Sequence, residues 1–143
     1  PEVVFLNTSG GLTGGDRLAY ALEVPAGARV TATTQTAERA YAAGAGTARV
    51  EVRLSVGAGG WLDWLPQETI LFDGAAVDRT VTLDLAAGAG ALFLETVILG
   101  RHPHRQPLMD AVRHFRRPRL GEGDAQYRVG RYALQQQPQH AVG

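Results

Sequence analysis

The chain has 143 residues, enough for one domain with a hydrophobic core. It has no cysteine, and all 14 basic residues are arginine, which excludes disulfides, thiolate metal sites and mechanisms that depend on a lysine. The net charge is zero, but residues 1–100 carry 11 acids and six arginines, whereas 101–143 carry three acids and eight arginines. Without a long apolar run or a basic leader, we expect a cytoplasmic protein with no membrane segment and no signal peptide.

The first unusual segment is NTSGGLTGGDR at 7–17, in which four glycines precede an acid. A glycine-rich loop can bind phosphate through its backbone N–H groups, but the nucleotide-binding loop also requires a lysine after its last glycine. Asp16 stands there instead and would repel an anion. We therefore interpret the segment as a structural turn, formed by Gly10, Gly11, Gly14 and Gly15.

Three runs, at 17–24, 49–56 and 79–85, alternate apolar and polar residues, which is typical of half-buried strands. Each is followed by a small-residue turn around Gly27, Gly59 or Gly88, so that the unit recurs about every 30 residues, as in stacked repeats. The predicted inward-facing residues are Leu18, Tyr20, Leu22, Val24, Val50, Val52, Leu54, Val56, Val81, Leu83 and Leu85.

The runs after these turns, at 28–36, 60–69 and 90–99, are more apolar. Gln35, Gln67 and Thr96 each lie eight positions past the turn glycine, so polar residues recur in register. The pattern predicts an all-β fold in which repeated strand-turn-strand units stack as a β-solenoid-like or layered-sheet structure, with a closed β-sandwich as the alternative. Such a stack is expected to bury Leu62, Trp64, Leu92, Phe93 and Leu94.

The repeat stops after Arg101, so we divide the chain into a β domain at 1–101 and a basic tail at 102–143. Within the tail, 107–117 begins with proline, places apolar residues on one helical face and is followed by Pro118, which predicts a short helix. The glutamine-rich end at 135–139 is expected to be disordered. We expect the tail to make few contacts with the core.

Side chains that could carry chemistry are few. His102 and His104 could share a metal, although Pro103 between them disfavours a regular strand, and solvated loop histidines remain the alternative. Trp61 and Trp64 could stack on a sugar or a base, or belong to the core. No serine stands in a G-x-S-x-G motif, so the sequence assigns no nucleophile.

Four carboxylates stand out: Asp16, Glu68, Asp73 and Glu95. Glu68 and Glu95 interrupt apolar stretches, and because burying an unpaired charge is costly, both are expected to have partners. These partners could be backbone groups or arginines of adjacent layers. Alternatively, the carboxylates could line a polar channel or relay a metal.

Four longer motifs follow one another along the chain: GGLTGGD (10–16), TTQTAERAY (33–41), GAGGWLDWLPQETILFDGA (57–75) and FLETVILGR (93–101). In their order and separations they resemble the UreD family of urease accessory proteins, also called UreH, over about residues 3–101. The sequence from His102 onward matches nothing in the family pattern and is expected to be divergent or truncated.

The resemblance implies a non-enzymatic chaperone or scaffold that is required for nickel incorporation into the urease active site. Its partners would be the urease apoprotein and the accessory proteins F and G, the latter a GTPase, without nucleic acid or membrane. No cofactor would be tightly bound, and nickel would pass transiently through a tunnel. Asp16, Glu68, Asp73 and Glu95, chosen above from the residues themselves, are our candidates for its ligands. The alternatives are a stand-alone β-solenoid that binds or cleaves carbohydrate and, more weakly, a nucleic-acid-binding protein that uses the arginine-rich tail.

Overall fold

The structure, a computed structural model, describes residues 1–100, 119–120 and 127–129, the last two segments by their backbone alone. Every regular element in these residues is a β-strand. The helix predicted at 107–117 and the end predicted to be disordered lie outside the described residues. The strands are β1 (Glu2–Phe5), β2 (Arg17–Val24), β3 (Arg29–Thr34), β4 (Glu38–Ala40), β5 (Ala48–Val56), β6 (Trp61–Trp64), β7 (Thr69–Leu71), β8 (Val77–Leu85), β9 (Gly90–Phe93), β10 (Val97–Leu99), β11 (Arg119–Leu120) and β12 (Tyr127–Val129).

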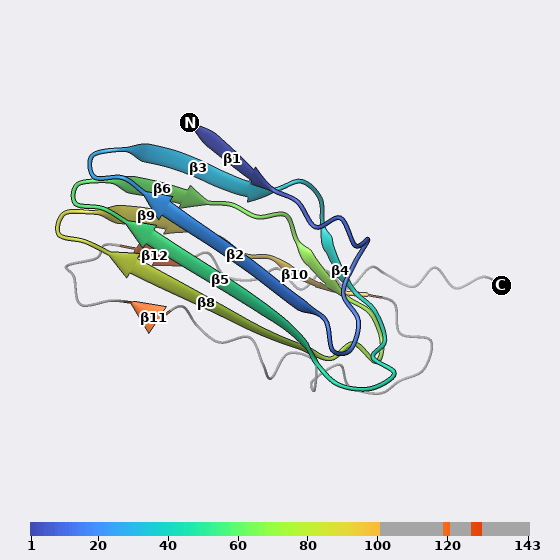
Figure 1. The fold of residues 1–143 in the computed structure, drawn as a ribbon. Coiled ribbons are helices and arrows are strands. Elements are labelled where there is room, and N and C mark those ends of the chain that lie inside the picture. The colour runs from blue at the N-terminus through green and yellow to red at the C-terminus, as the bar shows by residue number, and fades with distance from the viewer. Residues whose placement is uncertain (101–118, 121–126, 130–143) are drawn as a thin grey trace.

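These strands form three parallel sheets. Sheet A has the order β1-β3-β6-β9-β12, sheet B the order β10-β7-β4, and sheet C the order β11-β8-β5-β2. The chain visits sheets C, A and B in turn, so that β2-β3-β4, β5-β6-β7 and β8-β9-β10 are three successive coils (Figure 1). Parallel pairing between successive coils is the geometry of a β-solenoid. The predicted stack of strand units is therefore confirmed, and the antiparallel β-sandwich is excluded.

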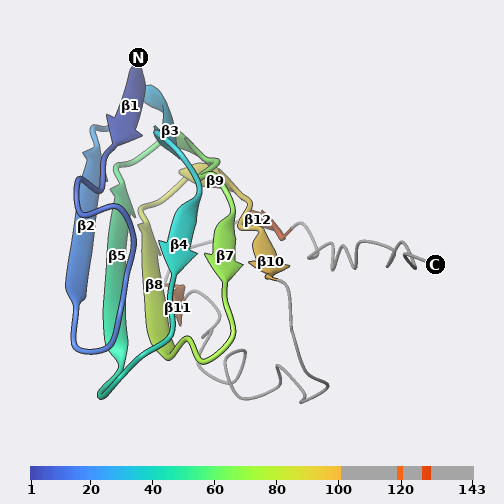
Figure 2. The ribbon, with the colours of Figure 1, turned by 90° about the vertical axis from the view of Figure 1, so that its right-hand side faces the viewer.

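The register shows how regular the stacking is. In sheet C, Arg17 lies opposite Arg49 and Arg49 opposite Asp78, so successive coils are offset by 32 and then 29 residues. The same offsets relate Val30, Leu62 and Ala91 in sheet A. Figure 2 shows β2, β5 and β8 side by side in one layer and β4, β7 and β10 in another. The predicted repeat is thus a translation along the axis of the solenoid.

The turn from sheet C to sheet A is the same in all three coils. Its third residue, Gly27, Gly59 or Gly88, has a φ of 68, 65 or 68°, a backbone conformation that favours glycine. In each turn the fourth residue donates its N–H to the carbonyl of the first, as in a type II turn. Turns of adjacent coils are also joined, because the N–H of Gly27 donates to the carbonyl of Ala58 at 2.9 Å.

Alternation along the strands builds the core. The inward residues of β5 and β8 are buried, and the largest fully buried side chains are Trp64, Leu54, Leu62, Leu71, Leu83 and Val52. The expectation that all of Leu92, Phe93 and Leu94 are buried is wrong: Phe93 is buried, but Leu92 and Leu94 are 37% and 38% exposed. Strand geometry accounts for this result, since neighbours of an inward-facing residue must point outward.

The sheet ladders continue beyond Arg101. Arg119 and Leu120 pair with Thr82 and Leu83 of β8, and β12 pairs with β9, both in parallel. At the opposite end of sheet C, β2 pairs with β5 alone among the described strands, and its inward residues before Val24 are half-buried. The coils are therefore best packed in the middle of the described solenoid. Within the described residues no helical segment has the length and hydrophobicity that crossing a bilayer requires.

Candidate functional site

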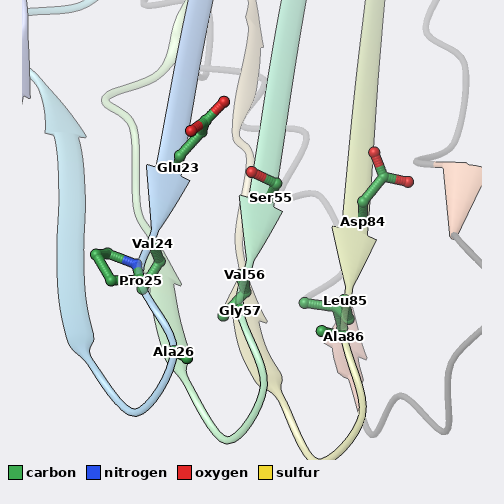
Figure 3. Close-up of a pocket in the computed structure, with 10 residues that line it drawn as sticks. All are labelled: Glu23, Val24, Pro25, Ala26, Ser55, Val56, Gly57, Asp84, Leu85 and Ala86. Carbon is green, nitrogen blue, oxygen red and sulfur yellow. The ribbon is translucent and has the colours of Figure 1, made fainter.

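An open trough of about 790 Å³ lies on the outer face of sheet C, where β2, β5 and β8 end. Glu23, Ser55 and Asp84 lie opposite one another in the register, and their side chains project in a row (Figure 3). One hydroxyl between two carboxylates is a sparse set of metal ligands. No group of three histidine, cysteine, aspartate or glutamate side chains that could hold a metal occurs in the described part of the chain.

A second polar site lies inside the solenoid. Arg79 takes an inward position of β8, and its guanidinium forms an ion pair with the Glu95 carboxylate, with a further contact of 3.3 Å from Nε to Oε2. Trp64 also donates its indole N–H to Glu95 Oε1 at 3.3 Å. The side chains of Arg79 and Glu95 are only 10% and 11% exposed. Both charges have therefore lost most of their hydration, and the attraction between them offsets part of that cost.

A third polar site lies around Glu38, at the start of β4 in the first coil. The side-chain amide of Asn7 donates to both carboxylate oxygens of Glu38, at 3.1 and 2.9 Å. Burial raises the pKa of the nearby Tyr20 hydroxyl above its ordinary 10.0, and the Glu38 carboxylate raises it further, while Arg79 lowers it. The Tyr20 ring packs on Phe5 with ring centres 4.8 Å apart.

Together these groups form a polar series through an otherwise apolar interior. Glu38 and Arg79 both act electrostatically on Tyr20, and Arg79 binds Glu95. Glu38 belongs to the first coil, whereas Arg79 and Glu95 belong to the third. The series therefore spans the described solenoid from one coil to another.

The glycine-rich segment at 7–17 contacts the Glu38 site through Asn7. Asn7 accepts hydrogen bonds at Oδ1 from the N–H and the hydroxyl of Ser9, at 3.0 and 2.6 Å, while its amide reaches Glu38. A Cβ on Gly11 would lie 2.6 Å from the ring of Tyr41, and one on Gly14 would lie 2.1 Å from a backbone carbonyl. Both positions need glycine because the next coil packs directly against them.

Gly10 and Gly15 need glycine for another reason, since their φ angles are 77 and 88° and no atom lies within 4 Å of an added Cβ. Asp16 closes this segment on itself: its carboxylate accepts the N–H of Thr13 at 2.8 Å, and its own N–H donates to the carbonyl of Thr13. The carbonyl of Asp16 also accepts the N–H of Arg49 in the next coil. Asp16 therefore has local contacts that hold the turn and the start of β2.

The remaining predicted residues lie apart from these. Glu68 is half-buried in the link between β6 and β7, and its carbonyl accepts the N–H of Glu38 at 2.9 Å. Asp73 is exposed in the link between β7 and β8. In the part of the chain that the structure describes, Asp16, Glu68, Asp73 and Glu95 do not meet at one metal centre. His102 and His104 lie outside the described residues.

The two tryptophans differ. Trp64 is completely buried, so it cannot stack on a sugar. Trp61 is half-buried and donates its indole N–H to Asp63 at 2.8 Å. The guanidinium of Arg29 lies 5.3 Å from the centre of the Trp61 ring, and a Cβ on Gly90 would lie 2.5 Å from that ring. Covered from both neighbouring coils, Trp61 does not offer the exposed platform that carbohydrate binding requires.

Sequence analysis missed two of the interior residues, Arg79 and Glu38. Arg79 could have been found, because it stands two positions before Val81 and alternation places both on the inward face. Glu38 gave no comparable signal, since β4 has only three residues and follows a polar stretch.

The site thus defines a class of protein: a parallel β-solenoid with an interior polar series. The family model of the UreD urease accessory protein matches residues 1–121, a range that includes all four quoted motifs and extends past Arg101. The chain belongs to the UreD family of urease accessory proteins.

Several curated relatives carry the name urease accessory protein UreD. The relative from Cereibacter sphaeroides (strain ATCC 17029 / ATH 2.4.9) is 74% identical over 101 residues, which cover 71% of this chain and 37% of the relative. The one from Paracoccus denitrificans (strain Pd 1222) is 60% identical over 101 residues, or 71% and 36% of the two chains. The one from Jannaschia sp. (strain CCS1) is 54% identical over 110 residues, or 77% and 41%. The chain therefore spans about two fifths of the length of these relatives.

Proposed function

We propose that this chain acts in the maturation of urease, as a chaperone or scaffold that helps nickel reach the urease active site. The observation that carries the proposal is membership of a family named for urease accessory proteins, with up to 74% identity to its members. In this role the chain binds apo-urease on one side and the accessory proteins F and G on the other. It works in the cytoplasm, catalyses no reaction and holds no resident cofactor.

We further propose that nickel passes this protein with carboxylate oxygens as transient ligands, the candidates being Asp16, Glu68, Asp73 and Glu95. Sites with several imidazoles or thiolates would trap nickel, which stands high in the affinity series of divalent metals. A carboxylate that acts as a single protein ligand binds nickel more weakly and suits transit. The interior position of Glu95 supports its place on such a route, whereas the contacts of Asp16 suit a structural role equally well.

The test is co-expression of urease with variants of this chain, followed by measurement of urease nickel, soluble yield and complex formation. Asp16→Asn, Glu68→Gln and Asp73→Asn keep the size of each side chain and remove its charge. For Glu95 the suitable variant is the double change Arg79→Met with Glu95→Leu, which avoids leaving a buried guanidinium unpaired. Lower urease nickel with normal yield and normal complex formation supports the route. Normal nickel content of urease with all the candidates changed would rule out this route.

A further inference from the structure

We propose that the outer face of sheet C is a docking surface for a second copy of this chain, placed face to face with its strands antiparallel to those of the first. On β2 and β5 the outward residues are exposed except for Ser55, which is half-buried. This self-association does not depend on the proposed role in urease maturation. The face consists of Arg17, Ala19, Ala21 and Glu23 on β2, Arg49, Glu51, Arg53 and Ser55 on β5, and Asp78, Thr80, Thr82 and Asp84 on β8.

The charges of this face are separated by sign. Where the strands begin, the register places Arg17 directly opposite Arg49, and like charges in such positions destabilise a sheet. Where the strands end, Glu23, Ser55 and Asp84 form the row drawn in Figure 3. Among the described residues, none of these two arginines and two acids belongs to an ion pair within 4 Å. One end of the face therefore carries uncompensated positive charge, and the other end carries uncompensated negative charge.

A two-fold axis that crosses the strands at the level of Tyr20 and Val52 makes the two ends meet. Each strand then lies antiparallel on the same strand of the second copy, and every contact occurs twice. Arg17 faces the second copy's Glu23. Arg49 faces the second copy's Ser55, which lies in the register between Glu23 and Asp84. The uncompensated charges of each sign thereby gain partners of the opposite sign.

The middle of the face suits the same arrangement. The alanines of β2 face each other, as do the threonines of β8, and such small side chains allow the two sheets a close approach. Glu51 and Arg53, which lie 2.7 Å apart within one copy, face the second copy's Arg53 and Glu51. The contact of Asp78 with the second copy's Asp84 is unfavourable, and Arg49, the neighbour of Asp78 in the register, lies beside it.

The charges also select the orientation of the second copy. A two-fold axis parallel with the strands of β5 would place Arg49, Glu51 and Arg53 each on its own equivalent, so that like charges meet along the whole strand. The face covers on the order of 300 Å² in each copy, less than the roughly 800 Å² per copy of a stable dimer. We therefore expect a weak dimer whose affinity falls as the salt concentration rises.

The test is sedimentation equilibrium of the full chain at protein concentrations up to about 1 mM, the range in which a weak dimer is populated. Salt is raised from about 0.1 to about 1 M, over which the screening length falls from about 10 to about 3 Å. The two variants are Arg17→Glu and Glu23→Arg. Arg39→Glu and Glu2→Arg are matched controls that make the same charge changes at exposed positions of sheets B and A. Circular dichroism verifies that each variant is folded.

We expect the wild-type chain and both controls to dimerise at low salt. Each single variant on sheet C creates two like-charge contacts in its own dimer and should weaken it about tenfold or more. An equimolar mixture of Arg17→Glu and Glu23→Arg chains should dimerise like the wild-type chain, because each introduced charge faces an opposite charge of the other variant. A monomeric wild-type chain, equal weakening in the controls, or no recovery in the mixture would overturn the proposal.

Discussion

Two glutamates face the interior of this solenoid, and they differ in burial and in hydrogen-bonding partners. Glu95 in the third coil has an arginine and an indole N–H as partners and is 11% exposed. Glu38 in the first coil is half-buried, and its hydrogen bonds come from a neutral amide. The deeper carboxylate has an arginine as its counter-charge, and the other has a neutral amide as its partner.

The difference follows from how deeply each side chain is buried. The Glu95 side chain is only 11% exposed, so its charge has lost most of its water and needs a counter-charge. Around Glu38 the inward residues of β2 are half-buried where those of β5 are buried, so a carboxylate there can do with a neutral partner. The cost of leaving a charge without a counter-ion therefore differs between the two positions.

The largest expected effect is on Glu95. Glu95→Gln leaves the buried Arg79 guanidinium without its counter-ion, and we expect the free energy of unfolding to fall by about 3–5 kcal/mol. Urea denaturation followed by circular dichroism measures this loss. In the double variant Arg79→Met with Glu95→Leu, most of the stability should return. An equally unstable double variant would mean that packing, and not charge pairing, accounts for the loss.

A smaller effect is expected at Trp64. Trp64→Phe keeps an aromatic ring in the core but removes the indole N–H that donates to Glu95, so we expect a loss of about 2 kcal/mol, as for a hydrogen bond to a charged group. The same denaturation measurement applies. Combining Trp64→Phe with Arg79→Met and Glu95→Leu should add less than the sum of the two losses. Simple additivity would show that the indole N–H does not depend on the carboxylate.

Glu38→Gln makes the same chemical change as Glu95→Gln, and we expect it to alter the free energy of unfolding by no more than about 1 kcal/mol. Glutamine retains an oxygen for the Asn7 amide, and no described arginine loses an ion-pair partner. Parallel urea titrations of the two glutamine variants measure the contrast directly. If Glu38→Gln is as destabilising as Glu95→Gln, the two carboxylates do not differ as described above.

The smallest effect concerns the ionisation of Tyr20, on which charges of both sites act. Its pKa should exceed 10.0 in the native chain because of burial and the Glu38 carboxylate, fall in Glu38→Gln and rise further in Arg79→Met. A folded-state pKa above the unfolded value means that this contribution to stability is complete below pH 10 and is lost as the pH rises through the native pKa. Titration of the Tyr20 Cζ resonance measures these shifts. Shifts of equal sign in the two variants would contradict the arrangement.

Much of the fold could be predicted because it repeats. The alternation in 17–24 and 49–56 coincides with β2 and almost with β5, and the turn glycines recur at the spacing of the coils. The prediction was wrong for Leu92 and Leu94, where an apolar run was taken as buried throughout although strand alternation turns every second residue outward. Hydrophobicity alone does not separate the two faces of a short strand.

The site was less accessible to sequence reasoning. The cost of burying a lone charge correctly predicted a partner for Glu95, but the arginine that pairs with it belongs to the same coil and not to an adjacent layer. The particular partner, Arg79, is 16 residues away, a separation that no local pattern marks. The contact between Asn7 and Glu38 spans 31 residues and joins an irregular segment to a three-residue strand. The first pair meets within one coil, where the chain passes from sheet C to sheet A and on to sheet B, and the second meets where the segment before β2 packs on the first coil.

The recurrent turn between sheets C and A determines which side chains of the following strand point inward. It occupies 25–28, 57–60 and 86–89, four residues in each coil, whereas the links from sheet B to sheet C run over 41–47 and 72–76, seven and then five residues. One residue inserted in the four-residue turn would invert every side chain of the next strand relative to its ladder. Insertions and deletions accepted during evolution should therefore accumulate at the variable links, which can change in length while the coils stay aligned.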